Sequence, residues 1–240
     1  MPSAKYDKIY RELRRRIETE EYEFQEMLPS EKVLTEQFKS SRNTVRRAIS
    51  QLAAEAYVQS VHGKGVVVIY QKENQAEFVL GGIETLREAA ERNHMEYTTK
   101  VICFAELIVD AGIQRRTSFP IGAEIYYVQR VRYVGEEALI IDHNYLLKEV
   151  AHGLTSEIAE NSIYAYLENV LGETIKTTRR KLTVERNSQL DETYMDLKGY
   201  NAVAVVSSHT YNADGVMFEY TQSRHRPDQF AFYDQAQRIR

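Results

Sequence analysis

The clearest hydrophobic pattern in the chain follows Ser41, where apolar residues recur at steps of three and one. This spacing is typical of one face of an α-helix. The apolar face consists of Val45, Ala48, Ile49, Leu52, Ala53 and Ala56. The opposite face is polar, and we expect it to be exposed to solvent. It consists of Arg42, Asn43, Arg46, Arg47 and Ser50.

A shorter helix is predicted directly before this one. Ser30 follows Pro29 as an N-cap. The apolar stripe of this helix, which we expect to be buried, consists of Val33, Leu34 and Phe38. Residues 39–41 leave room only for a tight turn, and so short a connection makes the two helices cross steeply. The two segments together predict a helix-turn-helix.

Residues 58–70 predict a β-hairpin, because β-branched residues lie on both sides of a Gly63-Lys64-Gly65 tip. The glycines would let the tip approach a sugar-phosphate backbone closely, and Lys64 would bring one positive charge to it. A further helix is predicted over Lys5–Glu20. Its apolar face consists of Tyr6, Tyr10, Leu13 and Ile17. Three helices and a hairpin of this kind form a winged helix-turn-helix.

The arginine-rich face after Ser41 suits the major groove of DNA, where guanidinium groups reach phosphates and the acceptor edge of guanine. The alternative is an amphipathic surface helix whose arginines are merely solvated, but this alternative leaves the hairpin unexplained. The candidate DNA contacts are Ser41, Arg42, Asn43, Thr44, Arg46, Arg47, His62, Gly63, Lys64 and Gly65.

The charge distribution supports the same interpretation. The chain has a net charge of −4, but residues 1–72 hold thirteen Lys or Arg against ten Asp or Glu, a net +3, which leaves −7 for the remainder. Within residues 39–72 the count is six against one. Positive charge gathered on the predicted helix and hairpin is typical of a protein that binds duplex DNA.

The composition predicts a cytoplasmic protein of two domains. There is enough apolar content for two cores, no apolar run long enough to cross a bilayer, and no signal peptide after Met1. The single cysteine, Cys103, cannot form an intramolecular disulfide, and we expect it to be a small core residue. Residues 71–78 are polar and lack periodicity, which predicts a linker between domains at 1–72 and 79–240.

The second domain is predicted to be α+β with a mostly antiparallel sheet, because strands outnumber helices and the turns are short. The predicted helices cover residues 82–93, 162–172 and 187–199. The predicted strands cover residues 100–109, 124–134, 138–147, 177–186, 201–211 and 216–226.

Two arginines stand out in the strand at 124–134. Residues two apart in a strand face the same side, so Arg130 and Arg132 project together, roughly 7 Å apart. If the next turn closes through residues 135–137, Asp142 falls opposite Arg130, although a one-residue slip would move it away. The group is either an exposed cross-strand salt bridge or a site for an anionic, hydroxyl-bearing ligand, since arginine suits phosphate and aspartate accepts from sugar hydroxyls.

Ser162 is the predicted N-cap of the helix at 162–172, and a helix start also offers N–H groups to an anion. If the arginines serve a ligand, we expect an Arg130→Ala protein to keep nearly its full melting temperature. The reason is that an exposed ion pair contributes only about 0–1 kcal/mol to stability.

Two sets of motifs carry a resemblance to a known family. The N-terminal part resembles the DNA-binding domain of GntR-family bacterial transcription regulators through LPSEKVLTEQFKSSRNTVRRAISQL, followed by HGKG. The remainder resembles the UTRA domain of the HutC subfamily, which has a chorismate-lyase-like fold, through RVRYVGEEALIIDHNYL, SIYAYLENVLG and FEYTQSRHR. The resemblance implies effector contacts at Arg130, Arg132, Asp142, Ser162, Tyr164, Glu219 and His225, with Gly81, Gly82 and Thr85 completing a phosphate cradle.

The chain also departs from the family pattern. Asp142 and His225 stand where glutamate and tyrosine are more usual, and Gly81-Gly82 replaces a hydroxyl-bearing stretch. In the hairpin, His62 replaces a frequent arginine. These departures bear on ligand contacts and not on architecture.

The two ends of the chain, at residues 5–17 and 221–238, look like those of family members that repress trehalose operons in Gram-positive bacteria. This resemblance implies a repressor without a cofactor that trehalose 6-phosphate releases from its operator. We expect a homodimer on an inverted repeat of double-stranded DNA, since one helix-turn-helix covers only a half-site.

Two alternatives remain open at this point. One is a HutC-type regulator that responds to an amino-sugar phosphate, a phosphonate or an amino-acid derivative. The other is a small-molecule enzyme with the chorismate-lyase-like fold. Against the enzyme, the sequence shows no metal-ligand spacing, no nucleophile elbow and no phosphate-binding glycine loop.

Overall fold

The computed structural model describes residues 5–71, 78–79 and 96–233 of the 240-residue chain. These residues belong to two compact units that divide near residue 75, each with hydrophobic clusters of its own. Within the described ranges, no helix combines the length and the hydrophobicity that crossing a bilayer requires.

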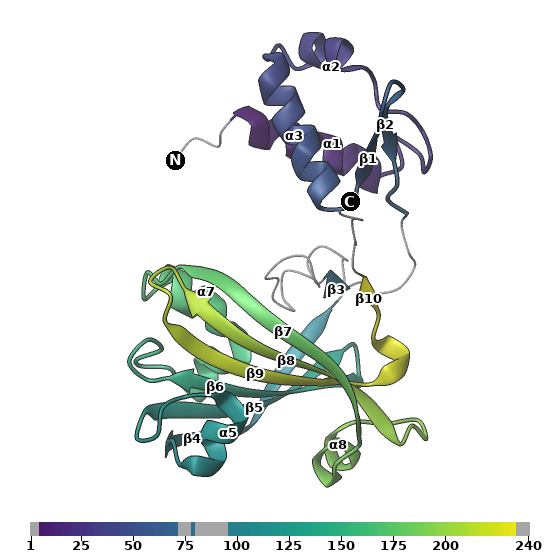
Figure 1. The fold of residues 1–240 in the computed structure, drawn as a ribbon. Coiled ribbons are helices and arrows are strands. Elements are labelled where there is room, and N and C mark those ends of the chain that lie inside the picture. The colour runs from purple at the N-terminus through teal and green to yellow at the C-terminus, as the bar shows by residue number, and fades with distance from the viewer. Residues whose placement is uncertain (1–4, 72–77, 80–95, 234–240) are drawn as a thin grey trace. The chain divides into compact units, whose positions relative to one another are not determined.

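The first unit is a winged helix-turn-helix (Figure 1). In chain order its elements are α1 (Lys5–Glu18), α2 (Glu31–Gln37), α3 (Arg42–Ala54), β1 (Val58–Val61) and β2 (Gly65–Val68). The strands β1 and β2 pair in antiparallel fashion, and Met27 adds an antiparallel bridge to Val67. The predicted helix-turn-helix and hairpin are confirmed, while the bridge from the segment before α2 is a feature that the sequence pattern did not indicate.

The core of this unit is built from the predicted apolar faces of its helices. The buried members are Ile9, Tyr10, Leu13, Ile17, Leu28, Leu34, Val45, Ala48, Ile49, Leu52, Tyr57, Val58 and Val68. Two predictions are wrong in detail. Val33 is 49% exposed, because the seven-residue α2 turns Leu34 inward instead. The first helix ends at Glu18, since Glu20 adopts a positive φ of 57° that an α-helix cannot contain.

The second unit is built on a six-stranded sheet with the strand order β4-β5-β6-β9-β8-β7, in which every neighbouring pair is antiparallel (Figure 1). Its strands are β4 (Tyr97–Ile108), β5 (Glu124–Val134), β6 (Glu137–Leu147), β7 (Ile175–Arg186), β8 (Ala202–Asn212) and β9 (Met217–His225). Its helices are α5 (Ala111–Thr117), α6 (Ser156–Asn161), α7 (Ile163–Asn169) and α8 (Gln189–Tyr194). The predicted α+β class with an antiparallel sheet is confirmed.

A short parallel pair accompanies the sheet. The strand β3 (Phe78–Val79) pairs with β10 (Phe232–Tyr233), which follows the 3-10 helix η1 (Pro227–Gln229). The sequence pattern predicts neither this pair nor the helices α5 and α6, and the helix predicted at 187–199 is limited to the six residues of α8. The helix predicted at 82–93 lies outside the described residues.

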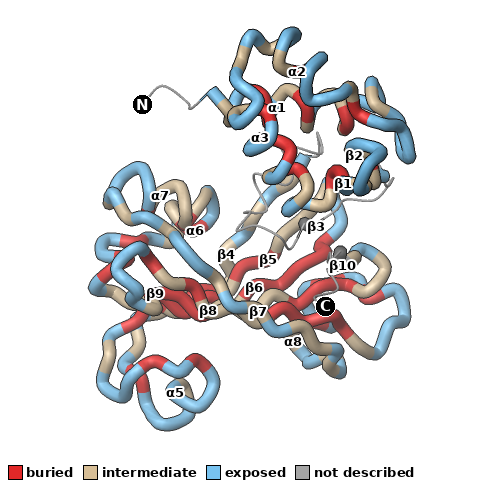
Figure 2. Tube along the Cα trace, turned by 45° about the horizontal axis from the view of Figure 1, so that its top comes forward, coloured by how far each residue is buried: buried red, intermediate tan, exposed pale blue. Residues whose placement is uncertain are grey.

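The two faces of the sheet carry different clusters. We call face A the side that carries Arg130 and Arg132 of β5, and face B the opposite side. Apolar residues of face A pack against α6 and α7 through Ala159, Ile163 and Leu167. On face B one cluster packs against the α8 region and another against the segment around α5. Figure 2 shows that buried residues concentrate along the central strands. Cys103 on β4 is a free, half-buried thiol, so it is not the core residue that we expected.

Candidate DNA-binding surface and effector site

The polar face of α3 is exposed, as predicted: Arg42, Asn43, Arg46, Arg47 and Ser50 all lie on the surface. Two of these arginines have partners within the unit. The Nε atom of Arg46 lies 3.5 Å from Oε1 of Glu31 in α2, and the Arg47 guanidinium lies 3.8 Å from the ring centroid of Tyr6. These contacts hold the guanidinium groups at the helix surface without burying them.

Ser41 and Thr44 begin the same helix. The Oγ of Ser41 accepts a hydrogen bond from the Thr44 backbone N–H at 3.2 Å, and the two hydroxyl oxygens lie 2.8 Å apart. An N-cap hydrogen bond holds the first turn of a helix in place, so both residues help to position the arginine-bearing surface that follows them.

The tip of the hairpin, His62 to Gly65, is exposed and places Lys64 at its end. Gly63 and Gly65 adopt positive φ angles of 73° and 128°. A side chain at Gly65 would also lie only 2.8 Å from the terminal methyl of Met27. The positive φ angles of the turn therefore account for both glycines, whatever the tip contacts.

The pairing of β5 with β6 places Arg130 directly opposite Asp142, which confirms the predicted register. A bulge between Arg132 and Tyr133 makes this register compatible with a turn of only two residues between Val134 and Glu137. The Asp142 Oδ2 atom accepts from Nε of Arg132 at 2.8 Å and from Nη2 of Arg130 at 3.4 Å.

The prediction that this pair is exposed is wrong. Arg130 is only 5% exposed, because α6 covers it and its Nη1 donates to the Ala159 carbonyl at 3.3 Å. Burial, together with the neighbouring Arg132 charge, lowers the pKa of Arg130 to about 10. Burial by itself would raise the pKa of Asp142, but Arg132, Arg130 and the Ser223 hydroxyl hold it well below its usual range. Arg130 and Asp142 therefore remain charged at neutral pH.

Asn144 connects the arginines to a second carboxylate. Its Oδ1 accepts from Nε of Arg130 at 3.0 Å, and its Nδ2 donates to Oε1 of Glu219 at 3.2 Å and to Thr221 at 2.9 Å. The Tyr164 hydroxyl of α7 donates to the other Glu219 oxygen at 2.6 Å and lies 3.4 Å from Thr210. Burial, together with the Glu219 charge, raises the pKa of Tyr164.

These contacts form one continuous polar network on face A, which we call the polar belt. It consists of Arg130, Arg132, Asp142, Asn144, Tyr164, Thr210, Glu219, Thr221 and Ser223. The belt joins four strands and one helix. A belt of this composition offers cationic groups at one end and carboxylate, amide and hydroxyl groups along its length, which is the chemistry that an anionic, hydroxyl-rich molecule requires.

The structure brings most of the expected effector residues together. Arg130, Arg132, Asp142, Tyr164 and Glu219 belong to the belt. Ser162 caps α7, since its Oγ accepts from the Ala165 N–H at 3.2 Å. His225 follows Ser223 on the same side of β9, where its ring packs against Phe230 with centroids 5.0 Å apart. Gly81, Gly82 and Thr85 lie outside the described residues.

Sequence reasoning missed four members of the belt: Asn144, Thr210, Thr221 and Ser223. The alternation of strand residues could have found Asn144, because it lies two positions after Asp142 and must face the same side. The other three come from β8 and β9, and their position depends on which strands lie next to each other.

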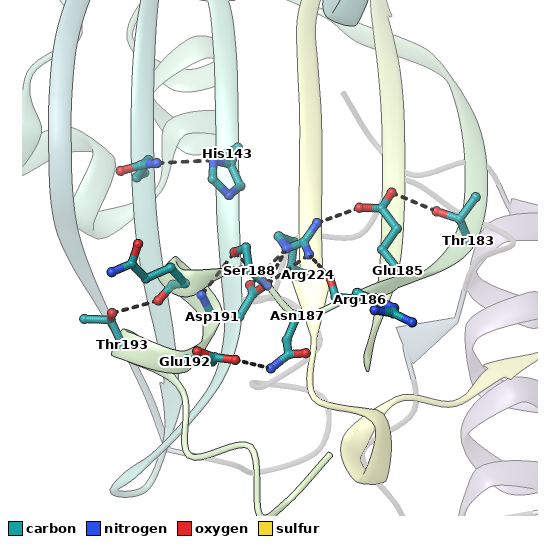
Figure 3. Close-up of polar contacts among 12 residues, drawn as sticks. His143, Thr183, Glu185, Arg186, Asn187, Ser188, Asp191, Glu192, Thr193 and Arg224 are labelled. Carbon is teal, nitrogen blue, oxygen red and sulfur yellow. Dashed lines mark hydrogen bonds and ion pairs between the residues drawn. The ribbon is translucent and has the colours of Figure 1, made fainter. Parts of the chain in front are cut away.

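A separate polar network lies on face B (Figure 3). Arg224 donates from Nε to Oδ1 of Asp191 at 2.9 Å and from Nη1 to Oε2 of Glu185 at 2.8 Å. Asp191 also accepts from the Ser188 N–H at 2.7 Å and so completes the capping box of α8. This network fastens α8 to the sheet, because one carboxylate serves both the helix start and the buried arginine.

The two units define a class of protein: a transcription regulator in which a winged helix-turn-helix for DNA accompanies a domain for a small-molecule effector. The chain belongs to the gntR family of bacterial regulatory proteins. Its residues 5–68 match the model of that family, and residues 92–231 match the model of the UTRA domain.

The chain is similar to two proteins of Bacillus subtilis. It is 36% identical over 238 residues to the HTH-type transcriptional regulator TreR of strain 168, with 99% of each chain covered. The solved effector binding domain of the B. subtilis trehalose repressor (TreR) aligns with a TM-score of 0.54 and 34% identity, over 60% of this chain and 99% of that one. The crystal structure of the possible transcriptional regulator YydK shares the fold, with a TM-score of 0.82 at 24% identity over 98% of this chain and 100% of that one.

Proposed function

We propose that this protein represses a trehalose-utilisation operon and leaves its operator when trehalose 6-phosphate binds the polar belt. The observation that carries the proposal is the 36% identity to TreR across both chains, because it spans the DNA-binding unit and the effector domain together. Residues 1–72 bind the operator in this proposal, and residues 79–240 bind the effector and hold two subunits together.

The chemistry of the belt supports a phosphorylated effector. Arg130 and Arg132 share the single carboxylate of Asp142, so this end of the belt keeps one positive charge that a phosphate would neutralise. Glu219, Asn144 and Thr221 can accept from or donate to sugar hydroxyls farther along. Arginine forks suit phosphate better than a neutral sugar, which favours the phosphorylated form over free trehalose.

The geometry of the first unit supports binding in the major groove. Arg42 and Arg46 lie on the exposed face of α3, and Lys64 lies at the tip of the hairpin. In the proposal α3 enters the groove while Lys64 reaches the backbone beside it. The effector acts by binding the DNA-free form more tightly than the DNA-bound form, since only a difference in affinity can shift the equilibrium between them.

Thermal unfolding of the purified protein against a panel of metabolites tests the proposal. The panel contains trehalose 6-phosphate, free trehalose, glucosamine 6-phosphate, a phosphonate and an amino-acid derivative. A ligand at about a hundred times its dissociation constant stabilises the folded protein by about 2.7 kcal/mol. We expect trehalose 6-phosphate to give the largest rise in melting temperature. It should also release the protein from duplex DNA that the protein has selected from a random-sequence library.

Two results would contradict specific parts of the proposal. In the first, the melting temperature rises only with the amino-sugar phosphate, the phosphonate or the amino-acid derivative. The protein would then still be a regulator of this family, but with a different effector. Consumption of trehalose 6-phosphate by the purified protein would instead support the enzyme alternative, and phosphate release or sugar analysis by chromatography measures it.

A further inference from the structure

The polar surface of face A continues beyond the belt to the edge of the sheet. Strand pairing places Thr221 of β9 opposite Ser208 of β8, and Ser208 opposite Arg180 of β7. One row away, Glu219 is paired with Thr210, and Thr210 with Thr178. Residues that are paired in this way project from the same side of a sheet, so Thr178, Arg180 and Ser208 share face A with the belt.

The contacts of Thr178 confirm the direction of its side chain. The Thr178 hydroxyl lies 3.4 Å from that of Thr210, which itself lies 3.4 Å from the Tyr164 hydroxyl. Arg180 is two residues farther along the same strand. Its positive charge acts on Tyr164 and offsets part of the rise in the Tyr164 pKa, while burial lowers the pKa of Arg180 itself. Arg180 is therefore a half-buried cation close to the belt and not a solvated surface residue.

The distance across the sheet matters for the size of the ligand. Arg130 on β5 and Arg180 on β7 are separated by four inter-strand steps, since β6, β9 and β8 lie between them. At about 4.8 Å a step, their backbones are roughly 19 Å apart. A phosphate at the Arg130 end with a single sugar ring leaves the far end uncovered. A second ring linked to the first would be needed to reach β8 and β7.

We propose that Thr178, Arg180 and Ser208 form a distal sugar subsite, through which the protein selects a disaccharide phosphate over a monosaccharide phosphate. This inference rests on the proposed function, because it places the phosphate at Arg130 and Arg132. The subsite offers the hydroxyls of Ser208 and Thr178 and the guanidinium of Arg180, which suit the hydroxyls of a neutral ring. The Thr178 hydroxyl also donates to the His209 carbonyl at 3.3 Å and can still accept from a ligand. A site built to hydrogen-bond a ring rejects a ligand that lacks it, since its polar groups lose their water without gaining partners.

Isothermal titration calorimetry with trehalose 6-phosphate and glucose 6-phosphate tests the subsite on the full-length protein. The variant is Arg180→Gln, and the matched control is Arg179→Gln, whose exposed side chain projects from the other side of the same strand. Loss of a hydrogen bond to a charged group corresponds to a roughly 10- to 100-fold weaker affinity. We expect Arg180→Gln to weaken trehalose 6-phosphate binding by this factor and to leave glucose 6-phosphate binding within about twofold.

The control variant should bind both phosphosugars like the wild type. Ser208→Ala provides a second, milder variant in case Arg180→Gln unfolds, and it should weaken only the disaccharide phosphate. Equal losses for both ligands would place Arg180 at the phosphate and overturn the subsite, as would unchanged affinities in both variants. Failure of the proposed function is a different result, because the wild-type protein itself would then bind neither phosphosugar.

Discussion

Arg130 donates from Nη2 to Oδ2 of Asp142 at 3.4 Å, and the two residues face each other across β5 and β6 in an almost fully buried position. In the proposed function, this relationship gives one side chain both a structural and a ligand-binding role. A buried ion pair is costly to break, because the partner that remains has lost its water without keeping its counter-charge.

Arg130→Ala should therefore affect both stability and induction. We expect the free energy of unfolding to fall by about 1–3 kcal/mol. This loss is smaller than for an isolated buried pair, because Asp142 keeps its hydrogen bonds from Arg132 and Ser223. Urea unfolding measures this loss, with Arg115→Ala at an exposed position as the control. Below the melting temperature, the variant should still bind operator DNA but no longer release it with trehalose 6-phosphate. Normal release by the variant would show that Arg130 serves only the fold.

His225 should make the protein less stable in mild acid. Burial lowers the pKa of His225 to about 4 in the folded protein, against about 6.5 in the unfolded chain. The unfolded chain thus binds more protons between these values. The neutral ring makes its full contribution to the free energy of unfolding above about pH 6.5. This contribution falls by roughly 3 kcal/mol as the pH approaches 4.

Thermal or urea unfolding between pH 7 and 4 measures this dependence. His225→Phe should flatten the curve in that interval, since phenylalanine does not titrate. The control is His152→Gln, at an exposed position of the same unit. If the His225→Phe curve kept the slope of the wild type, another group would be responsible for it.

Arg46→Ala should weaken operator binding with little effect on folding. Its ion pair with Glu31 is exposed, so losing it should change stability by only about 0–1 kcal/mol. If Arg46 reads a base, operator affinity should fall by about 1–3 kcal/mol, whereas loss of a phosphate contact should mainly reduce the salt slope by roughly one unit. Fluorescence anisotropy over a series of salt concentrations separates the two cases, with Lys176→Ala in the second unit as control. Unchanged affinity and salt slope would contradict the assignment of α3 as the DNA-reading helix.

Asp191→Asn should destabilise the second unit without changing which sugar it selects. The substitution removes the charge that faces buried Arg224 and weakens the capping box of α8, and breaking a buried pair costs about 3–5 kcal/mol. Because Arg224 projects from face B, the polar belt on face A keeps its own contacts. The ratio of the dissociation constants for trehalose 6-phosphate and glucose 6-phosphate should stay within about twofold of the wild-type ratio. A large change in that ratio would mean that the two faces are coupled.

The protein should be a homodimer that binds an inverted repeat, with its subunit interface within residues 79–240. One helix-turn-helix reads only a half-site, and a two-fold symmetric protein meets two-fold symmetric DNA. Sedimentation at micromolar concentration measures the mass of the free protein, and a deletion that leaves residues 79–240 should sediment as a dimer as well. A monomeric full-length protein would contradict this prediction.

The sequence by itself determined the elements with a strong local period. The spacing of apolar residues at steps of three and one predicted α3 and its exposed arginines, and the serine caps Ser30 and Ser162 predicted where α2 and α7 begin. It also predicted that Arg130 faces Asp142, because a short turn leaves two consecutive strands few ways to pair. All of these features depend on residues that are near one another in the chain.

Only the tertiary structure decided which groups complete the site. Glu219 and Ser223 reach Asn144 and Asp142 because β9 inserts between β6 and β8, although these pairs are 75 and 81 positions apart in sequence. The burial of Arg130 depends on α6, a helix that the sequence pattern does not predict. The apolar pattern predicts that Val33 is buried, whereas the packing of Leu34 leaves Val33 exposed. Periodicity reports which residues share one face of an element. It does not report what covers that face, because that depends on contacts between segments far apart in the chain.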